Sequence, residues 1–382
     1  MTDRRPDKKT SHIKDETTWS ESPRLIIKGF LMGSADVVPG VSGGTMALIT
    51  GIYNRLVYAV KSADSRVLRA LLTFRVSEIF TYLHWKFLLI LLAGIFGAVL
   101  FFTKVVPLQI YMYTDPELIY GLFFGLIAGS VFILMKEVGS DDRNWKSLLA
   151  LVAGTLIGFW VVTLVPTDTP ESFFFVFGSG MIAFCAMILP GISGSYFLLI
   201  LGKYDYVLSQ FARLGDQTGT ALLALLPLFL GGAAGLILFS RLLTWLLQNY
   251  YALTLMLLIG FLIGSLYVIW PYQVRTFQEH VRSVELYDPG SEIVQQLEEQ
   301  PSDTNRPEYL KLGSEVKTRE GPHEVAKVEV MRISRKLIQS RPFIPLIAEP
   351  DPNVEYDLWW GITGMLIGMA LVGGIDLLRE KK

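Results

Sequence analysis

The chain has 382 residues, of which 51% are hydrophobic and only 18% are charged, and its formal net charge is −1. Soluble domains of this size are usually less apolar, so the composition predicts a polytopic membrane protein; the balanced charge gives no indication of a nucleic-acid partner. The single cysteine, Cys185, excludes an intrachain disulfide and a cysteine-rich metal site. None of the four histidines lies in an apolar run, so we expect no metal and no cofactor.

The chain begins with a polar segment and continues into an interrupted apolar one. Residues 1–23 lack the apolar core of a signal peptide, and we expect them to form a disordered cytoplasmic tail. Residues 24–60 are apolar, but the stretch VVPGVSGGTMALI (37–49) places a proline, three glycines and a serine inside them. Proline and glycine end a helix, so we predict a break there.

Six uninterrupted apolar runs and a second interrupted one follow. About 20 apolar residues are enough to cross a bilayer core of roughly 30 Å. The predicted spans are 87–106, 118–136, 147–165, 221–247, 251–270 and 358–378. The interrupted segment 175–211 carries MILPGISGSYFLL (187–199), nearly the same phrase as before. Residues 271–357 are polar and are expected to form an inserted lobe with some strand, and 379–382 form the other terminus.

The sequence contains an internal repeat. Pro39-Gly40-Val41-Ser42-Gly43 aligns with Pro190-Gly191-Ile192-Ser193-Gly194. Three later pairs keep the same order: LAGIFGAVLF with LGGAAGLILF, GLIAGS with GFLIGS, and GTLIG with GMLIG. Glycine-spaced helix contacts resemble one another in any membrane protein, but four ordered matches predict two halves. The first is 24–165, and the second is 173–270 together with 358–378.

Each half is a broken segment followed by three spans, which fixes the predicted topology. If the broken segment enters and returns on one side, each half crosses the membrane three times, and the second half starts from the opposite face. The predicted fold is therefore an all-α inverted repeat, with a re-entrant broken-helix hairpin plus three transmembrane helices in each half.

The distribution of Lys and Arg predicts the orientation. Six lie in the segment through Arg24 and six in 54–86, whereas 107–117 and 166–172 hold none. Positively charged short loops face the cytoplasm. We therefore expect both termini in the cytoplasm, the 271–357 lobe on the extracytoplasmic side, and the protein in the cell (inner) membrane.

Each break is followed at once by a helix start. Serine is a good N-cap, and the small residues that follow would let a ligand approach free backbone N–H groups, which favour phosphate or carboxylate. Two such starts from opposite faces would form one anion site near the midplane. The alternative is that the hairpins only pack and cap themselves. The candidate ligands of the anion are Ser42, Gly43, Gly44, Thr45, Ser193, Gly194 and Ser195.

Five other polar residues are candidates for supporting roles. Asp36, close before the first break, either binds a coupling proton or cation or caps the adjacent helix. Arg241 either meets an anionic head group or snorkels to the surface. Lys28, Arg55 and Lys203 are expected nearer the membrane surfaces, where a substrate first meets the protein.

The two broken segments carry a family resemblance. GSADVVPGVSGGTMALITGIY (33–53) and MILPGISGSYFLLILGKY (187–204) resemble the signature segments of the DUF368 membrane proteins, which are polyprenyl-phosphate transporters. The resemblance implies a flippase, not an enzyme, that returns undecaprenyl phosphate from the outer to the inner leaflet for carrier-lipid recycling. It also implies coupling to an ion or proton gradient and a role for Asp36, 42–45 and 193–195.

Three other functions compete with this one. A carrier or channel for a small anion would use the same helix starts. A lipid phosphatase would need a nucleophile with a base in reach, and no His or Cys accompanies the breaks. A scaffold would leave the paired breaks unexplained.

Overall fold

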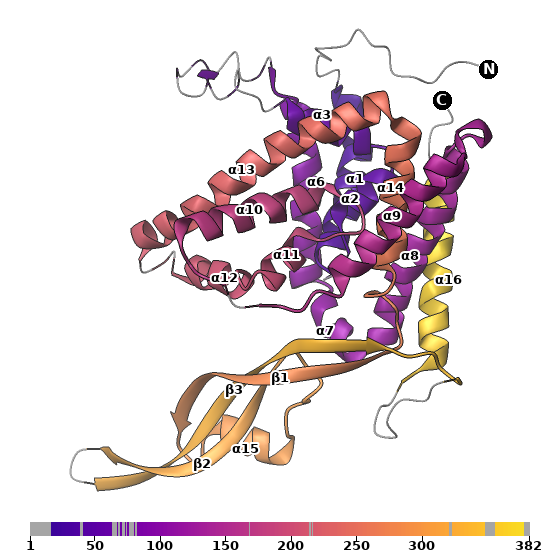
Figure 1. The fold of residues 1–382 in the computed structure, drawn as a ribbon. Helices are drawn as coiled ribbons and strands as arrows, with labels where there is room; N and C mark the ends of the chain where they lie inside the picture. The colour runs from indigo at the N-terminus through magenta and orange to yellow at the C-terminus, as the bar shows by residue number, and fades with distance from the viewer. Residues whose placement is uncertain are drawn as a thin grey trace.

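The chain forms a body of helices with a small sheet at one end (Figure 1). The computed structural model describes residues 17–377 except 39–40, 63–66, 68, 71–72, 74, 76–79, 81, 168, 214, 216, 321–322 and 348–355. Residues 1–16 and 379–382, which were predicted as cytoplasmic ends, lie outside the described residues. The tail ends earlier than predicted, because Thr17 is buried and a short turn, Trp19–Glu21, leads into the first helix at Ser22.

The helices of the first half are α1 (Ser22–Asp36), α2 (Gly43–Ile49), α3 (Tyr53–Lys61), α6 (Trp85–Lys104), α7 (Leu108–Thr114), α8 (Pro116–Glu137) and α9 (Trp145–Val162). Those of the second half are α10 (Phe173–Ile188), α11 (Gly194–Ile200), α12 (Tyr204–Ala212), α13 (Thr218–Asn249), α14 (Tyr251–Ser265) and α16 (Leu358–Leu377). The lobe contains β1 (Gln273–Tyr287), α15 (Glu292–Glu299), β2 (Glu308–Glu320) and β3 (His323–Pro342).

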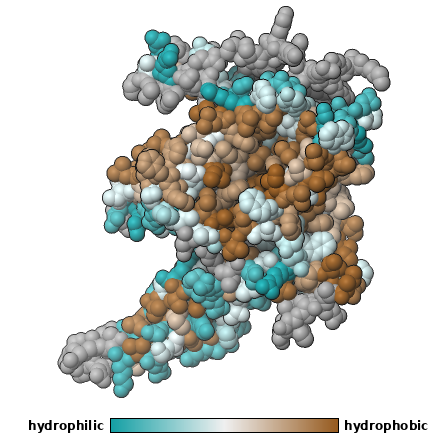
Figure 2. All heavy atoms as spheres, in the orientation of Figure 1, coloured by the Kyte–Doolittle hydropathy of each residue, from teal (hydrophilic) through white to brown (hydrophobic). Residues whose placement is uncertain are grey.

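Among the described residues, five helices are long and apolar enough to cross a membrane: α6, α8, α9, α13 and α16. They correspond to five of the six predicted spans, which is consistent with a polytopic membrane protein. The sixth prediction, 251–270, is too long, because α14 ends at Ser265. Pro271 disfavours helix at Trp270, and the Trp270 indole N–H instead donates to the Phe343 carbonyl in the lobe, at 2.8 Å. Figure 2 shows apolar side chains across the helical body and hydrophilic residues on the lobe.

The helices pack in four close pairs. Within the halves, α1 lies on α6 and α10 lies on α13; between the halves, α8 lies on α16 and α9 lies on α14. Glycines permit this approach: a Cβ at Gly125 would collide with the backbone of α16, and one at Gly368 with the backbone of α8. Without a hydrophobic driving force in lipid, such close backbone packing is a main source of helix association.

The local structure around the two breaks repeats at a fixed offset. Helix α2 and helix α11 each have seven residues, α3 and α12 each have nine, and both pairs start 151 residues apart (194 − 43 and 204 − 53). Gly51 and Gly202, also 151 apart, both have positive φ, of 74° and 62°. Only glycine adopts this conformation without strain. The sequence repeat is therefore also a structural repeat at this point.

The lobe adds a small sheet, so the fold is mostly helical and not all-α. Its antiparallel sheet has the order β1-β3-β2, and α15 covers one face by packing Val294 and Leu297 near Val328 and Val330. The alternation in KVEVMRI (327–333) predicts this strand, because every second side chain faces the same way. The lobe also contacts the first half: the ring of Tyr113 on α7 lies 5.3 Å from that of Phe277 on β1.

Candidate functional site

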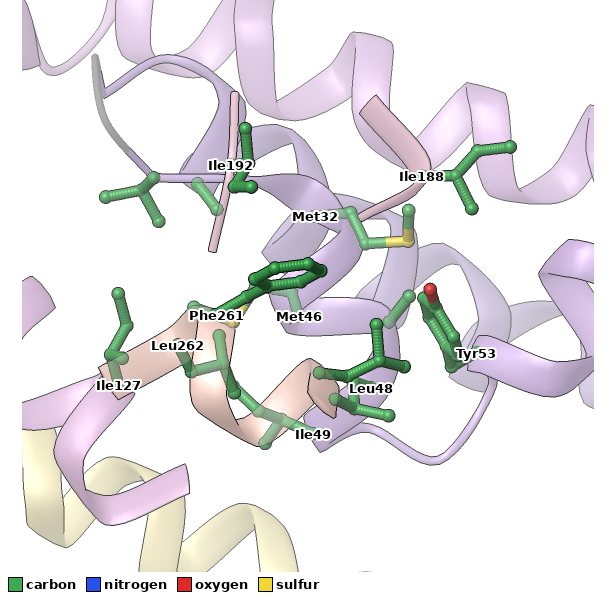
Figure 3. Close-up of a cluster of buried hydrophobic side chains, with 14 of the residues drawn as sticks. Met32, Met46, Leu48, Ile49, Tyr53, Ile127, Ile188, Ile192, Phe261 and Leu262 are labelled. Carbon is green, nitrogen blue, oxygen red and sulfur yellow. The ribbon is translucent and has the colours of Figure 1, made fainter. Parts of the chain in front are cut away.

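The two helix breaks are in direct contact. The Ser42 hydroxyl donates to the Leu189 carbonyl at 3.0 Å, and the Gly191 N–H donates to Thr45 Oγ1 at 2.9 Å. Ser42, Thr45 and Gly191 are buried. Figure 3 shows Ile188 and Ile192, which flank the second break, in one cluster of buried side chains with Met32 and Met46 of the first half. Segments about 150 residues apart in sequence therefore meet inside an apolar core.

The start of α2 is already capped by the protein. The Gly43 N–H donates to Asp36 Oδ1 at 2.7 Å, and the Gly44 N–H donates to Ser42 Oγ at 3.1 Å. All seven residues of α2 are buried. The sequence predicts free N–H groups here, and two of them have partners in this conformation. Ser42 is the N-cap that was predicted, and Asp36 takes the capping role that was one of its two alternatives. Pro39 and Gly40 lie outside the described residues.

The start of α11 differs from that of α2. Ser193 occupies the N-cap position, but its side chain makes no capping hydrogen bond. Its hydroxyl instead shares a 2.8 Å hydrogen bond with the hydroxyl of Ser195, which is exposed. A small pocket beside this helix start is lined by Val162, Gly191, Ile192, Ser193, Tyr196 and Val268. Ser193, at the start of α11, thus lines a small pocket.

One substitution between the halves removes the carboxylate cap from the second helix start. The residue 151 positions after Asp36 is Met187, and each side chain lies against the first glycine of the following helix, Gly43 or Gly194. A carboxylate accepts a backbone hydrogen bond, whereas a thioether is a weak acceptor. Aligning the halves at this offset is the signal that predicts a carboxylate cap at the start of α2 and none at the start of α11.

The remaining candidate residues lie in different surroundings. Arg241 is exposed on α13, and Lys28 is half-buried on α1. Arg55 forms an ion pair with Glu21 at 3.1 Å and lies 4.7 Å from the centre of the Phe87 ring. Arg55 therefore fastens α3 to the segment before α1 and to α6.

Lys203 was predicted near the surface, but its side chain is only 1% exposed. Its ammonium donates to the Thr169 carbonyl at 2.7 Å and lies 5.9 Å from the centre of the Phe175 ring. A lysine stem is long enough to follow apolar surface and deliver its charge to a carbonyl. The Thr169 hydroxyl in turn donates to the Leu201 carbonyl. Lys203 therefore ties the connection between the halves to the turn before α12.

An apolar helical body with two helix breaks in contact at its centre defines a membrane protein built like a transporter. A model of the VCA0040-like, undecaprenyl phosphate translocase-like family matches residues 32–285. The chain belongs to this family. A polyprenyl-phosphate transporter of Vibrio cholerae is 38% identical over 248 residues, which are 65% of this chain and 77% of that protein. A polyprenyl-phosphate transporter of Staphylococcus aureus is 33% identical over 258 residues, 64% of this chain and 85% of that protein. No solved structure matches the chain.

Proposed function

We propose that this protein is a flippase that carries undecaprenyl phosphate from the outer to the inner leaflet of the cell membrane, which returns the carrier lipid for reuse. Membership of the translocase-like family and the names of the two relatives support the substrate. The observation that carries the proposal is the direct contact between the two helix breaks. A carrier or channel for a small anion remains the alternative for the same helix starts.

The phosphate head would bind between the starts of α2 and α11. The α11 start is not capped by its own serine, and the hydroxyls of Ser193 and Ser195 lie beside it. Backbone N–H groups at a helix start favour an anion, so this half receives the head group first. The polyprenyl tail needs no polar site and stays among the lipid-facing apolar side chains.

Asp36 is the candidate for coupling. Its carboxylate holds the Gly43 N–H, which is one of the donors that the phosphate would use at the α2 start. Two negative groups in one apolar site repel each other and are costly to desolvate. Uptake of a proton or cation at Asp36 removes that repulsion and releases the Gly43 N–H to the phosphate. Substrate movement is thereby linked to an ion gradient.

An inverted repeat would provide alternating access. A two-fold rotation that exchanges the halves replaces α8 by α14 and α9 by α16. It therefore converts the α8–α16 pair into the α14–α9 pair and the α1–α6 pair into the α10–α13 pair. The four close pairs of the structure form a set that this exchange leaves unchanged. This supports two equivalent halves arranged about a shared site.

The test is leaflet exchange of a fluorescent polyprenyl phosphate in reconstituted vesicles, read by bleaching with an impermeant reductant. Replacing both Ser42 and Ser193 by Leu puts bulky side chains between the breaks, so exchange is expected to fall to the protein-free background. Ser209→Leu is the matched control, because this serine is exposed on α12, and it is expected to exchange lipid like the unchanged protein.

Inorganic phosphate uptake by the same vesicles separates the two candidate functions. The flippase proposal predicts lipid exchange without phosphate uptake, and uptake of phosphate alone would favour the small-anion carrier. Undiminished lipid exchange by a well-folded double variant would show that the two breaks do not form the transport site.

A further inference from the structure

The turn that joins β3 to the last membrane helix exposes a group of large apolar side chains. Ile344, Leu346 and Ile347 are 54%, 77% and 81% exposed. Leu346 has a φ of 68°, in the left-handed region that a non-glycine residue adopts only with strain. The turn thus holds three apolar side chains outward, where water would leave them unfavourably solvated.

This turn is fixed at its first residue, Phe343, to the segment between α14 and β1. The Phe343 carbonyl accepts from the Trp270 indole at 2.8 Å, and the Phe343 N–H donates to the Tyr272 carbonyl at 3.0 Å. The Tyr272 hydroxyl donates to the Leu358 carbonyl, the first residue of α16, at 2.7 Å. The turn therefore lies at the level at which α16 begins and is not a freely moving part of the lobe.

The surface beside it faces lipid. At the start of α16, Trp359 and Trp360 are 74% and 51% exposed, and Leu366 farther along the same helix is 62% exposed. Helix α16 is one of the helices long and apolar enough to span a membrane. Exposed tryptophans at the end of such a helix mark the boundary between head groups and acyl chains. The exposed turn is linked to this end of α16 through the hydrogen bonds from Phe343 to Tyr272 and from Tyr272 to Leu358.

We propose that residues 343–347 insert into the interfacial zone of the leaflet on the lobe side and anchor the base of the lobe to the bilayer. The occupant of this apolar surface is the lipid itself, at the depth where amphipathic segments bury their apolar face. Arg341, exposed just before the turn, is placed to meet phosphate groups of the lipid surface. The lobe is therefore held at the membrane by this turn as well as by its covalent connections to α14 and α16.

The test measures depth by spin labelling. The only cysteine, Cys185, is replaced by Ser, and single cysteines at positions 346 and 347 receive a nitroxide in vesicles of phosphatidylethanolamine and phosphatidylglycerol. Collisions with oxygen, which concentrates in lipid, are compared with collisions with a water-soluble nickel complex. Two references use exposed positions: Ile367 on α16 for lipid, and His280 on β1 for water.

Labels at 346 and 347 are expected to favour oxygen over nickel, as the label at 367 does. Labels that behave like the one at 280 would overturn the proposal, because they would leave the turn in water and open to a protein partner. With the label at position 346, Ile347→Asp is expected to raise collisions with nickel relative to oxygen. With the label at position 347, Leu346→Asp is expected to have the same effect. Each readout is independent of transport.

Discussion

At the scale of single residues, the central question is whether Asp36 only caps a helix or also couples transport to an ion. Its Oδ1 accepts the Gly43 N–H at 2.7 Å, so structure alone gives it a capping role. Asn keeps an acceptor oxygen in the same place but cannot bind a proton at physiological pH. Ala removes both functions. The two substitutions therefore separate capping from coupling.

We predict that Asp36→Asn unfolds at the same temperature as the unchanged protein, whereas its lipid exchange no longer responds to an imposed pH gradient. Asp36→Ala is expected to lose about 1 kcal/mol of stability as well, the usual cost of a lost cap. Thermal unfolding in detergent and exchange in vesicles with and without the gradient measure the two effects. A normal gradient response in Asp36→Asn would leave the residue as a cap alone.

At this scale, the sequence predicts interactions between residues close in the chain better than interactions that depend on how distant segments pack. The serine N-cap at Ser42 depends on neighbouring backbone only, and it is confirmed. The hydrogen bond between Thr45 and Gly191 depends on how the halves dock, which no local pattern contains. The burial of Lys203 depends on tertiary contacts in the same way, because its ammonium donates to the Thr169 carbonyl in the connection between the halves. The roles of these residues in transport stay predictions.

At the scale of elements, close helix pairs depend on glycines that leave room for a neighbouring backbone. Gly125 and Gly368 are such positions in the α8–α16 pair, whereas a Cβ at Gly97 on α6 would meet nothing within 4 Å. We predict that Gly125→Leu and Gly368→Leu each destabilise the fold by about 1–3 kcal/mol, the typical cost of overpacking. Gly97→Leu, the matched control, is expected to unfold like the unchanged protein.

Thermal unfolding of the purified protein in detergent measures these differences. Equal unfolding temperatures for Gly125→Leu and Gly97→Leu would mean that α8 and α16 are not in close backbone contact.

The length of a helix is also a property that the sequence alone does not predict. Residues 251–270 are predominantly apolar, but α14 ends at Ser265, and Trp270 beyond it donates to the Phe343 carbonyl of the lobe. Hydropathy predicts which residues are removed from water, but it does not predict which part of the protein they contact.

At the scale of the whole molecule, the packing divides the body differently from the sequence repeat. Helices α8, α9, α14 and α16 come from both halves and pack across the repeat boundary, whereas α1–α6 and α10–α13 each pair within one half. In Figure 1, α10 and α13 run at an angle to the group that contains α8 and α16. We expect the four crossing helices to act as one frame, against which the two other pairs move during transport.

The proposed inverted repeat requires each broken segment to be re-entrant. The positions at the two ends of the second broken segment can test this. If residues 173–212 enter and return on one side, the positions before α10 and after α12 face the same compartment, whereas a spanning segment would place them on opposite sides. Glu171 and Arg213 are exposed at these ends, and Asp141, exposed between α8 and α9, marks the predicted cytoplasmic side. Each is replaced by cysteine in the Cys185→Ser background.

We predict that an impermeant maleimide added to intact cells labels cysteines at 171 and 213 alike, and labels the one at 141 only after the membrane is permeabilised. The charge distribution supports this expectation, because the connection at 166–172 holds no Lys or Arg, whereas 136–146 holds three. Labelling of position 171 but not 213 would show that the segment crosses the membrane. The halves would then have an even number of crossings and the same orientation, so the two helix starts could not approach a common site from opposite leaflets.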